Sequence, residues 1–295
     1  MDGGVPMSFK GVLPGDSSCP GCLLPVALNL VVSSIGKKVV SVVPASCTSV
    51  IQGYYPKTAF DFPTINVPFA SAAPVAAGVS YALEIRGIKD VVVFAWAGDG
   101  GTADIGMAAL SGAAERNDNI LYIMYDNEAY MNTGIQRSGA TPYKAWTTTT
   151  PVIGKREAKK DVAKIMIAHG AKYVATASVG FHQDFIAKIR KASSISGFRF
   201  IQLHLPCPVG WRFDSEKTVE VAKLAVETGA WILYEYQDGK LRLTGPSAQL
   251  IEESRRKPLE EYLLLQGRFS HLTKEDIEQI KKLIKEQWEW IKKMI

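Results

Sequence analysis

Short runs of apolar, mostly β-branched residues recur along the chain, and each is followed by a helix-compatible or glycine-rich stretch. Most of these runs are continuously apolar rather than alternating, as expected for strands covered on both faces of a parallel sheet. We predict strands at residues 38–43, 90–95, 119–125, 171–176, 199–205 and 231–234. We predict intervening helices at residues 72–85, 105–116, 158–168 and 183–194. This rhythm predicts an α/β fold with a doubly wound, mostly parallel sheet, in which ligands bind beyond the carboxyl ends of the strands.

The last part of the chain has a different pattern. Thr273 and Asp276 have the spacing of a capping box, and apolar residues then recur every three or four positions, with lysines between them. This pattern predicts a C-terminal amphipathic helix. We therefore expect an α/β domain over residues 1–240 and a helical extension over residues 241–295, which docks on that domain or on a partner subunit.

Composition excludes several classes of protein. The 295 residues are 47% hydrophobic and 21% charged, as in globular proteins, and the net charge of +5 is scattered rather than clustered as in nucleic-acid binders. No stretch reaches the roughly 18 apolar residues of a membrane helix, and Met1–Gly4 lack the features of a signal peptide. Four cysteines are too few for a disulfide scaffold in a chain of this length. We expect a cytoplasmic protein with neither a nucleic-acid nor a membrane partner.

A glycine-rich loop follows the strand predicted at 90–95 and opens a helix. Gly98, Gly100 and Gly101 allow the backbone to approach a phosphate, but Asp99 would repel one unless a divalent cation lay between them. Gly-Asp-Gly therefore indicates a diphosphate bound through Mg²⁺ rather than a dinucleotide fingerprint. By itself the triplet is a weak signal, because it also occurs in ordinary turns.

The next predicted strand ends in Asp126 and Asn127, and Asn127 lies 28 positions after Asp99. One βαβ unit of this length brings both side chains to the same edge of the sheet. Together with the backbone carbonyl of Ala129, they would form an oxygen-rich half-shell for Mg²⁺. Gly-Asp-Gly followed at this distance by an asparagine that closes an apolar strand resembles the signature of thiamine diphosphate enzymes.

The four cysteines form one close pair, Cys19 and Cys22, and two distant members, Cys47 and Cys207. A thioredoxin-like redox pair would leave the distant two unexplained. Both follow predicted parallel strands, so they point to the same sheet edge as Asp99. Four thiolates at one edge indicate a structural zinc ion or an iron–sulfur cluster. A single close pair favours the cluster, because zinc sites usually contain two such pairs.

Taken together, the motifs resemble the β subunit of the 2-oxoacid:ferredoxin oxidoreductases, of which pyruvate synthase is the best-known type. The residues that carry this resemblance are Cys19–Cys22, the loop from Gly98 to Gly106, and Tyr125-Asp-Asn-Glu-Ala-Tyr-Met-Asn-Thr-Gly134. Residues 136–143 and 146–151 are similar to the same family, and the resemblance extends from about residue 19 to residue 211. It implies the thiamine diphosphate-binding fold.

The resemblance also implies roles for individual residues. Asp99, Asn127 and Ala129 match the Mg²⁺ ligands, and the four cysteines match the ligands of a 4Fe–4S cluster. Asn132 matches a catalytic asparagine that faces the substrate. The residues expected to contact the cofactor are Ser46, Thr48, Gly98, Gly100, Gly101, Asp104 and Ile105. We further expect Asp104 to cap the start of a helix and Glu128 to have a structural role.

The implied reaction is the reversible, coenzyme A-dependent oxidative decarboxylation of a 2-oxoacid, with ferredoxin as the electron acceptor. Pyruvate is the first expectation for the substrate, ahead of branched-chain oxoacids, 2-oxoglutarate and oxalate. This chain lacks ferredoxin-type cysteine clusters and the second α/β half that would supply a catalytic glutamate, so the resemblance implies α, γ and δ partner subunits. A non-redox thiamine decarboxylase subunit and a zinc-containing scaffold subunit are the alternatives.

Overall fold

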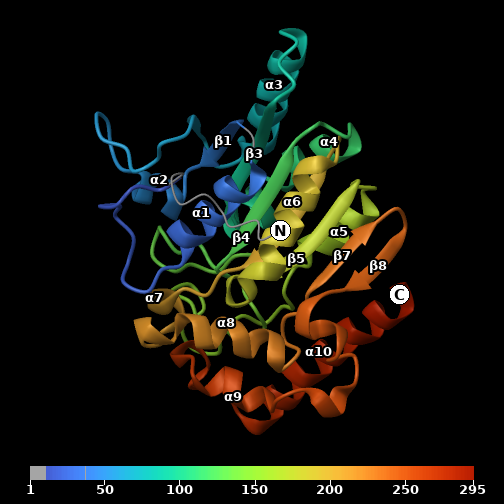
Figure 1. The fold of residues 1–295 in the computed structure, drawn as a ribbon. Coiled ribbons are helices and arrows are strands. Elements are labelled where there is room, and N and C mark those ends of the chain that lie inside the picture. Colours follow the sequence, from blue (N-terminus) through green and yellow to red (C-terminus); the bar gives the residue numbers. More distant parts are fainter. Residues whose placement is uncertain (1–10, 37) are drawn as a thin grey trace.

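The computed structural model describes residues 11–36 and 38–295, so the first four residues, which lack a signal-peptide pattern, lie outside it. Its centre is an eight-stranded sheet with the order β2-β1-β3-β4-β6-β5-β7-β8 (Figure 1). The first six strands in this order are parallel, and β7 and β8 are antiparallel additions at one edge. The strands are β1 (Lys38–Pro44), β2 (Thr64–Val67), β3 (Val91–Gly98), β4 (Leu121–Asp126), β5 (Tyr173–Ser178), β6 (Arg199–His204), β7 (Tyr234–Gln237) and β8 (Lys240–Leu243).

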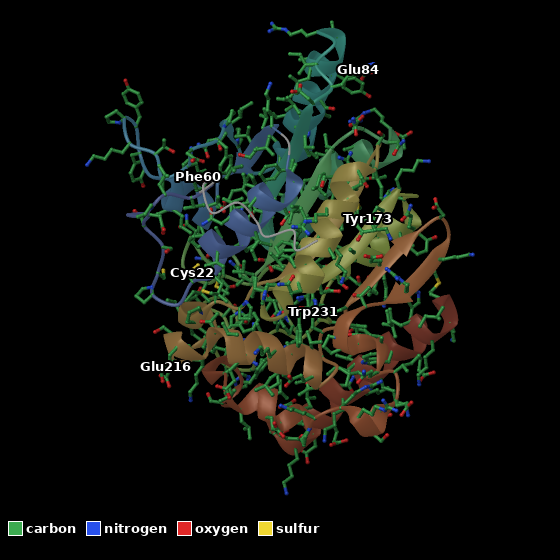
Figure 2. All side chains as sticks on the ribbon, viewed as in Figure 1. Cys22, Phe60, Glu84, Tyr173, Glu216 and Trp231 are labelled. Carbon is green, nitrogen blue, oxygen red and sulfur yellow. The ribbon has the colours of Figure 1, made fainter. Side chains whose placement is uncertain are left out.

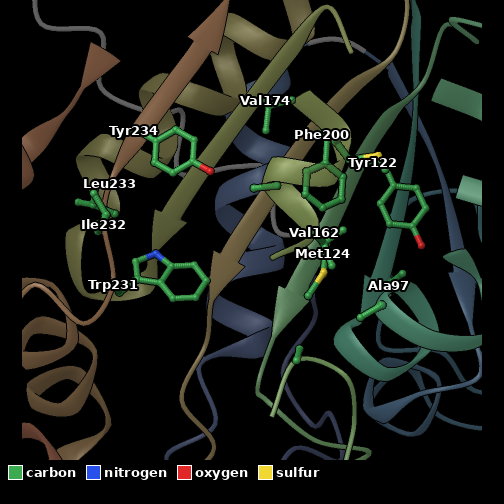
Figure 3. Packing of buried hydrophobic residues seen from close by; sticks show 14 of the residues in the cluster. Ala97, Tyr122, Met124, Val162, Val174, Phe200, Trp231, Ile232, Leu233 and Tyr234 are labelled. Carbon is green, nitrogen blue, oxygen red and sulfur yellow. The ribbon is translucent and has the colours of Figure 1, made fainter. Parts of the chain in front are cut away.

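Helices cover both faces of the sheet, which confirms the doubly wound α/β fold. On one face, α1 and α6 contact each other and pack on Phe94 and Ile123. On the other face, α3, α4 and α5 pack on a second cluster that includes Tyr122 and Phe200 (Figure 3). The helices of at least six residues are α1 (Leu24–Ile35), α2 (Cys47–Gln52), α3 (Ala72–Ile85), α4 (Met107–Glu115), α5 (Val162–Ala168), α6 (His182–Ser194), α8 (Thr218–Glu227), α9 (Leu259–Leu264) and α10 (Lys274–Met294).

The structure differs from the predicted elements mainly at the sheet edges and in the helices α1, α2 and α8, which were not predicted. The helix predicted at 72–85 has the observed bounds of α3, and the strands predicted at 38–43 and 199–205 each differ from β1 and β6 by one residue. The edge strands β2 and β8 were not predicted, because each has only four residues and little continuous apolar character. The strand predicted at 231–234 is wrong, because only Tyr234 belongs to β7.

The C-terminal amphipathic helix is confirmed as α10, and its Thr273 capping box is present. Trp288 and Ile291 are buried against the body of the molecule, and Trp288 Nε1 donates a hydrogen bond of 2.9 Å to the Gly229 carbonyl. Within this chain, α10 therefore docks on the α/β domain, beside β8 (Figure 1). The expected division at residue 240 runs through the β7–β8 hairpin, so the sheet extends into the part that we expected to be helical.

The strand order places four chemically important loops side by side. The strands β1, β3, β4 and β6 are consecutive neighbours in the sheet and run parallel, so their carboxyl ends lie at one edge. Beyond these ends lie Cys47, which begins α2, and Asp99, Asn127 and Cys207 in the loops after β3, β4 and β6. None of the helices in the described part of the chain combines the length and apolar character needed to cross a membrane.

Candidate cofactor site

A cavity of about 110 Å³ lies at this edge of the sheet. The loops after β1, β3 and β4 form its wall. Of the residues predicted to bind cofactor or substrate, those that line it are Ser46, Gly98, Asp99, Gly100, Gly101, Asn127, Ala129 and Asn132. Cys47 also lines the cavity, so a predicted cluster ligand and the predicted magnesium ligands share one wall.

Three oxygen atoms converge in this cavity. The side-chain oxygen of Asn127 lies 2.8 Å from Asp99 Oδ1 and 3.0 Å from the Ala129 carbonyl oxygen. In the opposite amide orientation, the nitrogen of Asn127 would donate hydrogen bonds to both. Neighbouring ligands of an octahedral Mg²⁺ ion are separated by about 2.9 Å, because each bond is about 2.0–2.1 Å long. The three predicted magnesium ligands therefore fit a Mg²⁺ ion, with the amide oxygen directed toward it.

Asp99 is held in place by a residue that was not predicted. Its side chain is fully buried, and Ser138 Oγ donates a hydrogen bond of 2.5 Å to Asp99 Oδ2. Burial and the nearby charge of Asp126 raise the pKa of Asp99 well above its ordinary value. A divalent cation would reverse this effect, because it stabilises the ionised carboxylate. Ser138 lies in the 136–143 segment that resembles the family, but nothing in that segment alone predicts its contact with Asp99.

Glu128 turns away from the cavity, in agreement with a structural role. Its backbone is left-handed (φ 66°), and its buried carboxylate lies 2.6 Å from both Lys159 Nζ and Arg268 Nη2. These two cations lower its pKa to about 2 despite the opposing effect of burial. Lys159 also lies 2.8 Å from the buried Asp126. A network of buried charges thus supports the segment that contains Asn127 from behind.

The glycine-rich loop is shaped by Tyr130, another residue that was not predicted. The hydroxyl of Tyr130 donates hydrogen bonds to the Gly100 carbonyl (3.1 Å) and to Asp104 Oδ2 (3.0 Å). A Cβ atom at position 100 would collide with the Tyr130 ring, so only glycine fits there. Asp104 also accepts hydrogen bonds from the Gly139 amide. The prediction that Asp104 caps a helix is wrong, because Gly101–Ile105 already forms a π-helix before α4 begins.

The four cysteines are all free thiols. Burial and, to a smaller extent, the neighbouring thiols Cys207 and Cys19 raise the pKa of Cys22 to about 11. Burial, the other three thiols and Asp99 raise the pKa of Cys47 to about 12. Cys47 is therefore within electrostatic range of the other three thiols and of Asp99. Figure 2 shows Cys22 at the lower end of the sheet, where the sulfur atoms gather.

The spacing of the thiols matters for the kind of metal centre. Among residues 11–36 and 38–295, no group of three or more Cys, His, Asp or Glu side chains is arranged to hold a single metal ion. A 4Fe–4S cluster binds one thiolate at each iron, so its four sulfurs are farther apart than those around one zinc ion. The Gly210 amide donates a hydrogen bond of 3.4 Å to Cys207 Sγ.

Three predicted cofactor contacts do not line the cavity. Thr48 is buried in the core, where it accepts a hydrogen bond of 3.1 Å from Trp96 Nε1. Ile105 is 61% exposed. Asp104 does not line the cavity and instead accepts hydrogen bonds from Tyr130 and from the Gly139 amide. Asn132 lines the rim and is exposed. The loops after β1, β3 and β4 thus form the wall of the cavity, and the exposed Asn132 borders it.

Comparison with known proteins identifies the family of the chain. The family of the thiamine pyrophosphate enzyme, C-terminal TPP binding domain, matches residues 45–203. The chain is 52% identical over 275 residues to the pyruvate synthase subunit PorB of Methanothermobacter marburgensis. The aligned region covers 92% of this chain and 93% of that protein. It is also 47% identical over 290 residues to the ketoisovalerate oxidoreductase subunit VorB of Pyrococcus furiosus. This aligned region covers 95% of this chain and 92% of that protein.

A solved structure shows the same fold. The 2-oxoglutarate:ferredoxin oxidoreductase of Magnetococcus marinus superposes with a TM-score of 0.60 at 24% identity, covering 76% of this chain and 81% of that chain. The fold, the family match and the two close relatives lead to one conclusion. This chain belongs to the thiamine diphosphate-binding β subunits of the 2-oxoacid:ferredoxin oxidoreductases.

Proposed function

We propose that this β subunit, together with its partner subunits, catalyses the reversible oxidative decarboxylation of pyruvate. The oxoacid anion and the thiol of coenzyme A give an acyl thioester, CO₂, one proton and two electrons. Two ferredoxin molecules, reached through other subunits, each accept one electron. The C–C bond to the carboxylate breaks, and the acyl carbon is oxidised as its bond to sulfur forms.

The observation that carries this proposal is the position of the four cysteines. Cys47 lines the cavity that holds Asp99, Asn127 and Ala129, and Cys207 follows β6 at the same edge of the sheet. Cys19 and Cys22 precede α1, and the pKa of Cys47 is raised by burial and, to a smaller extent, by the other three thiols. When bound, thiamine diphosphate supplies an electron sink for decarboxylation, and a 4Fe–4S cluster supplies one-electron transfer. A non-redox decarboxylase does not need four thiols here, and a scaffold subunit does not need three converging oxygens.

The residues of this chain have separate tasks in the proposed reaction. Asp99, Asn127 and Ala129 hold Mg²⁺ and, through it, the diphosphate. Gly100 and Gly101 keep the loop open to the phosphates. Ser46 contributes to the cavity wall, and Asn132 at the rim orients the oxoacid. Cys19, Cys22, Cys47 and Cys207 bind the cluster.

Pyruvate is the proposed substrate because the more similar of the two relatives reported above is a pyruvate synthase subunit. The second relative is named for ketoisovalerate, and its identity to this chain is only slightly lower. A branched-chain oxoacid is therefore the second candidate. Comparing kcat/KM for pyruvate and for 2-oxoisovalerate in the assembled enzyme distinguishes them.

The presence of the cluster is tested by the iron content of the chain. We expect the anaerobically purified chain to be brown, with absorbance near roughly 400 nm and about four iron atoms per chain. Cys22→Ala should lose most of this iron. Ser18→Ala, next to the cysteine pair, is the matched control and should retain it. A colourless chain with one zinc ion would contradict the redox function and support the scaffold alternative.

Dependence on a partner subunit is tested by turnover. Thiamine activation requires a carboxylic acid near the aminopyrimidine, and the described residues form only one α/β unit with one sheet. We therefore expect the purified chain to bind thiamine diphosphate and Mg²⁺ but to show no pyruvate oxidation with methyl viologen as acceptor. Adding the partner subunits should restore activity. Turnover by the chain alone would show that it contains its own acid.

A further inference from the structure

A tight turn at residues 138–141 contacts both of the segments that contain the predicted magnesium ligands. The Thr141 amide donates a hydrogen bond of 3.2 Å to the Ser138 carbonyl, which closes the turn. Ser138 and Thr141 are both fully buried. Neither residue lines the cofactor cavity, so the turn acts on the cavity only through the residues that it holds.

The first residue of the turn holds the carboxylate of Asp99. Ser138 Oγ donates a hydrogen bond of 2.5 Å to Asp99 Oδ2. The other carboxylate oxygen, Oδ1, is the one that lies 2.8 Å from the side-chain oxygen of Asn127. The Ser138 hydroxyl thus engages one oxygen of Asp99 and leaves the other directed toward the magnesium position.

The last residue of the turn holds the segment that contains the other two ligands. Thr141 Oγ1 donates a hydrogen bond of 2.6 Å to the carbonyl of Glu128, which lies between Asn127 and Ala129 in the chain. The same oxygen accepts a hydrogen bond of 2.9 Å from the Ser138 amide, so the hydroxyl group is used as both donor and acceptor. The turn therefore joins Asp99 to the segment from Asn127 to Ala129.

A buried lysine maintains the shape of the turn. Lys155 is 1% exposed, and its ammonium group donates hydrogen bonds to the carbonyls of Gly139 (2.9 Å), Thr141 (2.7 Å) and Ala158 (3.1 Å). An ammonium group has three donors, so all of them are used on backbone carbonyls. Burial lowers the pKa of Lys155 to about 8, which leaves the group protonated at neutral pH. Two of its three hydrogen bonds hold the turn itself.

The spacing of the three oxygens suits one metal ion better than another. The Asn127 oxygen lies 2.8 Å from Asp99 Oδ1 and 3.0 Å from the Ala129 carbonyl oxygen. Octahedral Mg²⁺ requires neighbouring oxygens about 2.9 Å apart and tolerates little deviation. Ca²⁺ binds oxygens at about 2.3–2.6 Å in variable geometries, so its binding depends less on a fixed spacing.

We infer that the turn at residues 138–141 sets the metal selectivity of the cofactor site. Ser138, Thr141 and Lys155 are positioning residues, which hold the three oxygens at the spacing that Mg²⁺ requires. This inference rests on the magnesium site of the proposed function and is independent of the oxoacid, of coenzyme A and of the iron–sulfur cluster.

Calorimetric titration of the full chain with thiamine diphosphate, once in MgCl₂ and once in CaCl₂, tests this inference. The ratio of the two affinities is the quantity of interest, because a variant that is only less stable loses both affinities equally. Thr141→Val keeps the shape of the side chain and removes its hydroxyl. We expect it to weaken binding with Mg²⁺ by about tenfold and binding with Ca²⁺ by less than about threefold. Thr141→Ser retains the hydroxyl and should keep the wild-type ratio.

Thr228→Val is the matched control. Thr228 is also buried, and its hydroxyl donates a hydrogen bond of 2.8 Å to the Leu224 carbonyl in α8, outside the cofactor cavity. This variant should lower the melting temperature and leave the ratio unchanged. Lys155→Met is a second test of the turn and should lower the ratio as Thr141→Val does. Where Lys155→Met fails to fold, the result for Thr141→Val decides the question.

The possible outcomes separate this inference from the proposed function. A ratio that falls in Thr141→Val and returns in Thr141→Ser supports the inference. An unchanged ratio in Thr141→Val would overturn it even where both affinities fall, because the turn would then act only through stability. A wild type that binds equally well with both ions would also overturn it and leave the proposed function intact. A wild type without metal-dependent binding would contradict the proposed magnesium site as well.

Discussion

Asp99→Asn is expected to abolish Mg²⁺-dependent binding of thiamine diphosphate and, at the same time, to raise the melting temperature of the cofactor-free chain. Asp99 provides the only formal charge among the three converging oxygens, so its loss should weaken cofactor binding by at least about 100-fold. Without a cation, the same carboxylate is fully buried near Asp126, and its pKa is raised. Asparagine keeps the shape and removes this uncompensated charge.

The size of the stabilisation follows from the cost of a buried, unpaired charge. We expect about 1–3 kcal/mol, or a rise of a few degrees in the melting temperature of the cofactor-free chain. Because the folded-state pKa is raised, the advantage of the variant should be largest at high pH and shrink as the pH falls and Asp99 of the wild type becomes protonated.

Calorimetry with thiamine diphosphate and Mg²⁺, and thermal unfolding without them, measure the two effects. Asp214→Asn, at an exposed aspartate, is the matched control and should change neither quantity appreciably. A variant that loses both binding and stability would show that Asp99 acts through folding. One that retains cofactor affinity would exclude Asp99 as the magnesium ligand.

Glu128→Gln is expected to destabilise the protein by about 3 kcal/mol at neutral pH, since it removes the shared anion of two buried ion pairs. The same figure follows from its pKa, which is lowered from 4.5 to about 2 in the folded protein. A lowered folded-state pKa means that Glu128 contributes this stability above about pH 4.5 and loses it as the pH falls toward 2.

Urea unfolding of both proteins between pH 7 and pH 3 measures this dependence. The difference in unfolding free energy between wild type and variant should be constant at neutral pH and decrease below about pH 4.5. Glu227→Gln, which breaks a more exposed pair with Lys257, is the matched control and should cost at most about 1 kcal/mol. A difference that does not change with pH would mean that Glu128 acts through its shape rather than through its charge.

The strands predicted most accurately from sequence are those that are buried along most of their length and paired on both sides. The strands β1 and β6 each have a neighbouring strand on both sides, all six residues of β6 are buried, and their positions were predicted to within one residue. The edge strands β2 and β8 take their structure from a neighbouring strand rather than from their own residues. Trp231–Leu233 resembles a strand in sequence, but Leu233 N donates to Ser247 Oγ of the 3-10 helix Gly245–Ala248, and the Ile232 carbonyl accepts from the Thr176 hydroxyl. Side chains rather than a neighbouring strand therefore hold this segment.

The same distinction holds for the candidate site. The spacing of Asp99 and Asn127 could be interpreted without a structure, because one βαβ unit separates them and parallel strands end at one edge. Ser138 and Tyr130 could not be found in this way. Their roles depend on where a long loop returns to the cavity, and many loop paths are compatible with the same residues.

The sequence by itself determined the chemical groups available to this protein: a carboxylate and an amide after two strands, two thiols after two others, and a cysteine pair before the first helix. Only the tertiary structure decided that β1, β3, β4 and β6 are neighbours, so that these groups share one edge. It also decided that Glu128 is paired with Arg268, 140 residues away, and that the turn at residues 138–141 joins Asp99 to the Glu128 carbonyl. The reason is physical: local sequence controls backbone conformation and amphipathic pattern, whereas strand order and buried ion pairs depend on how distant segments pack together.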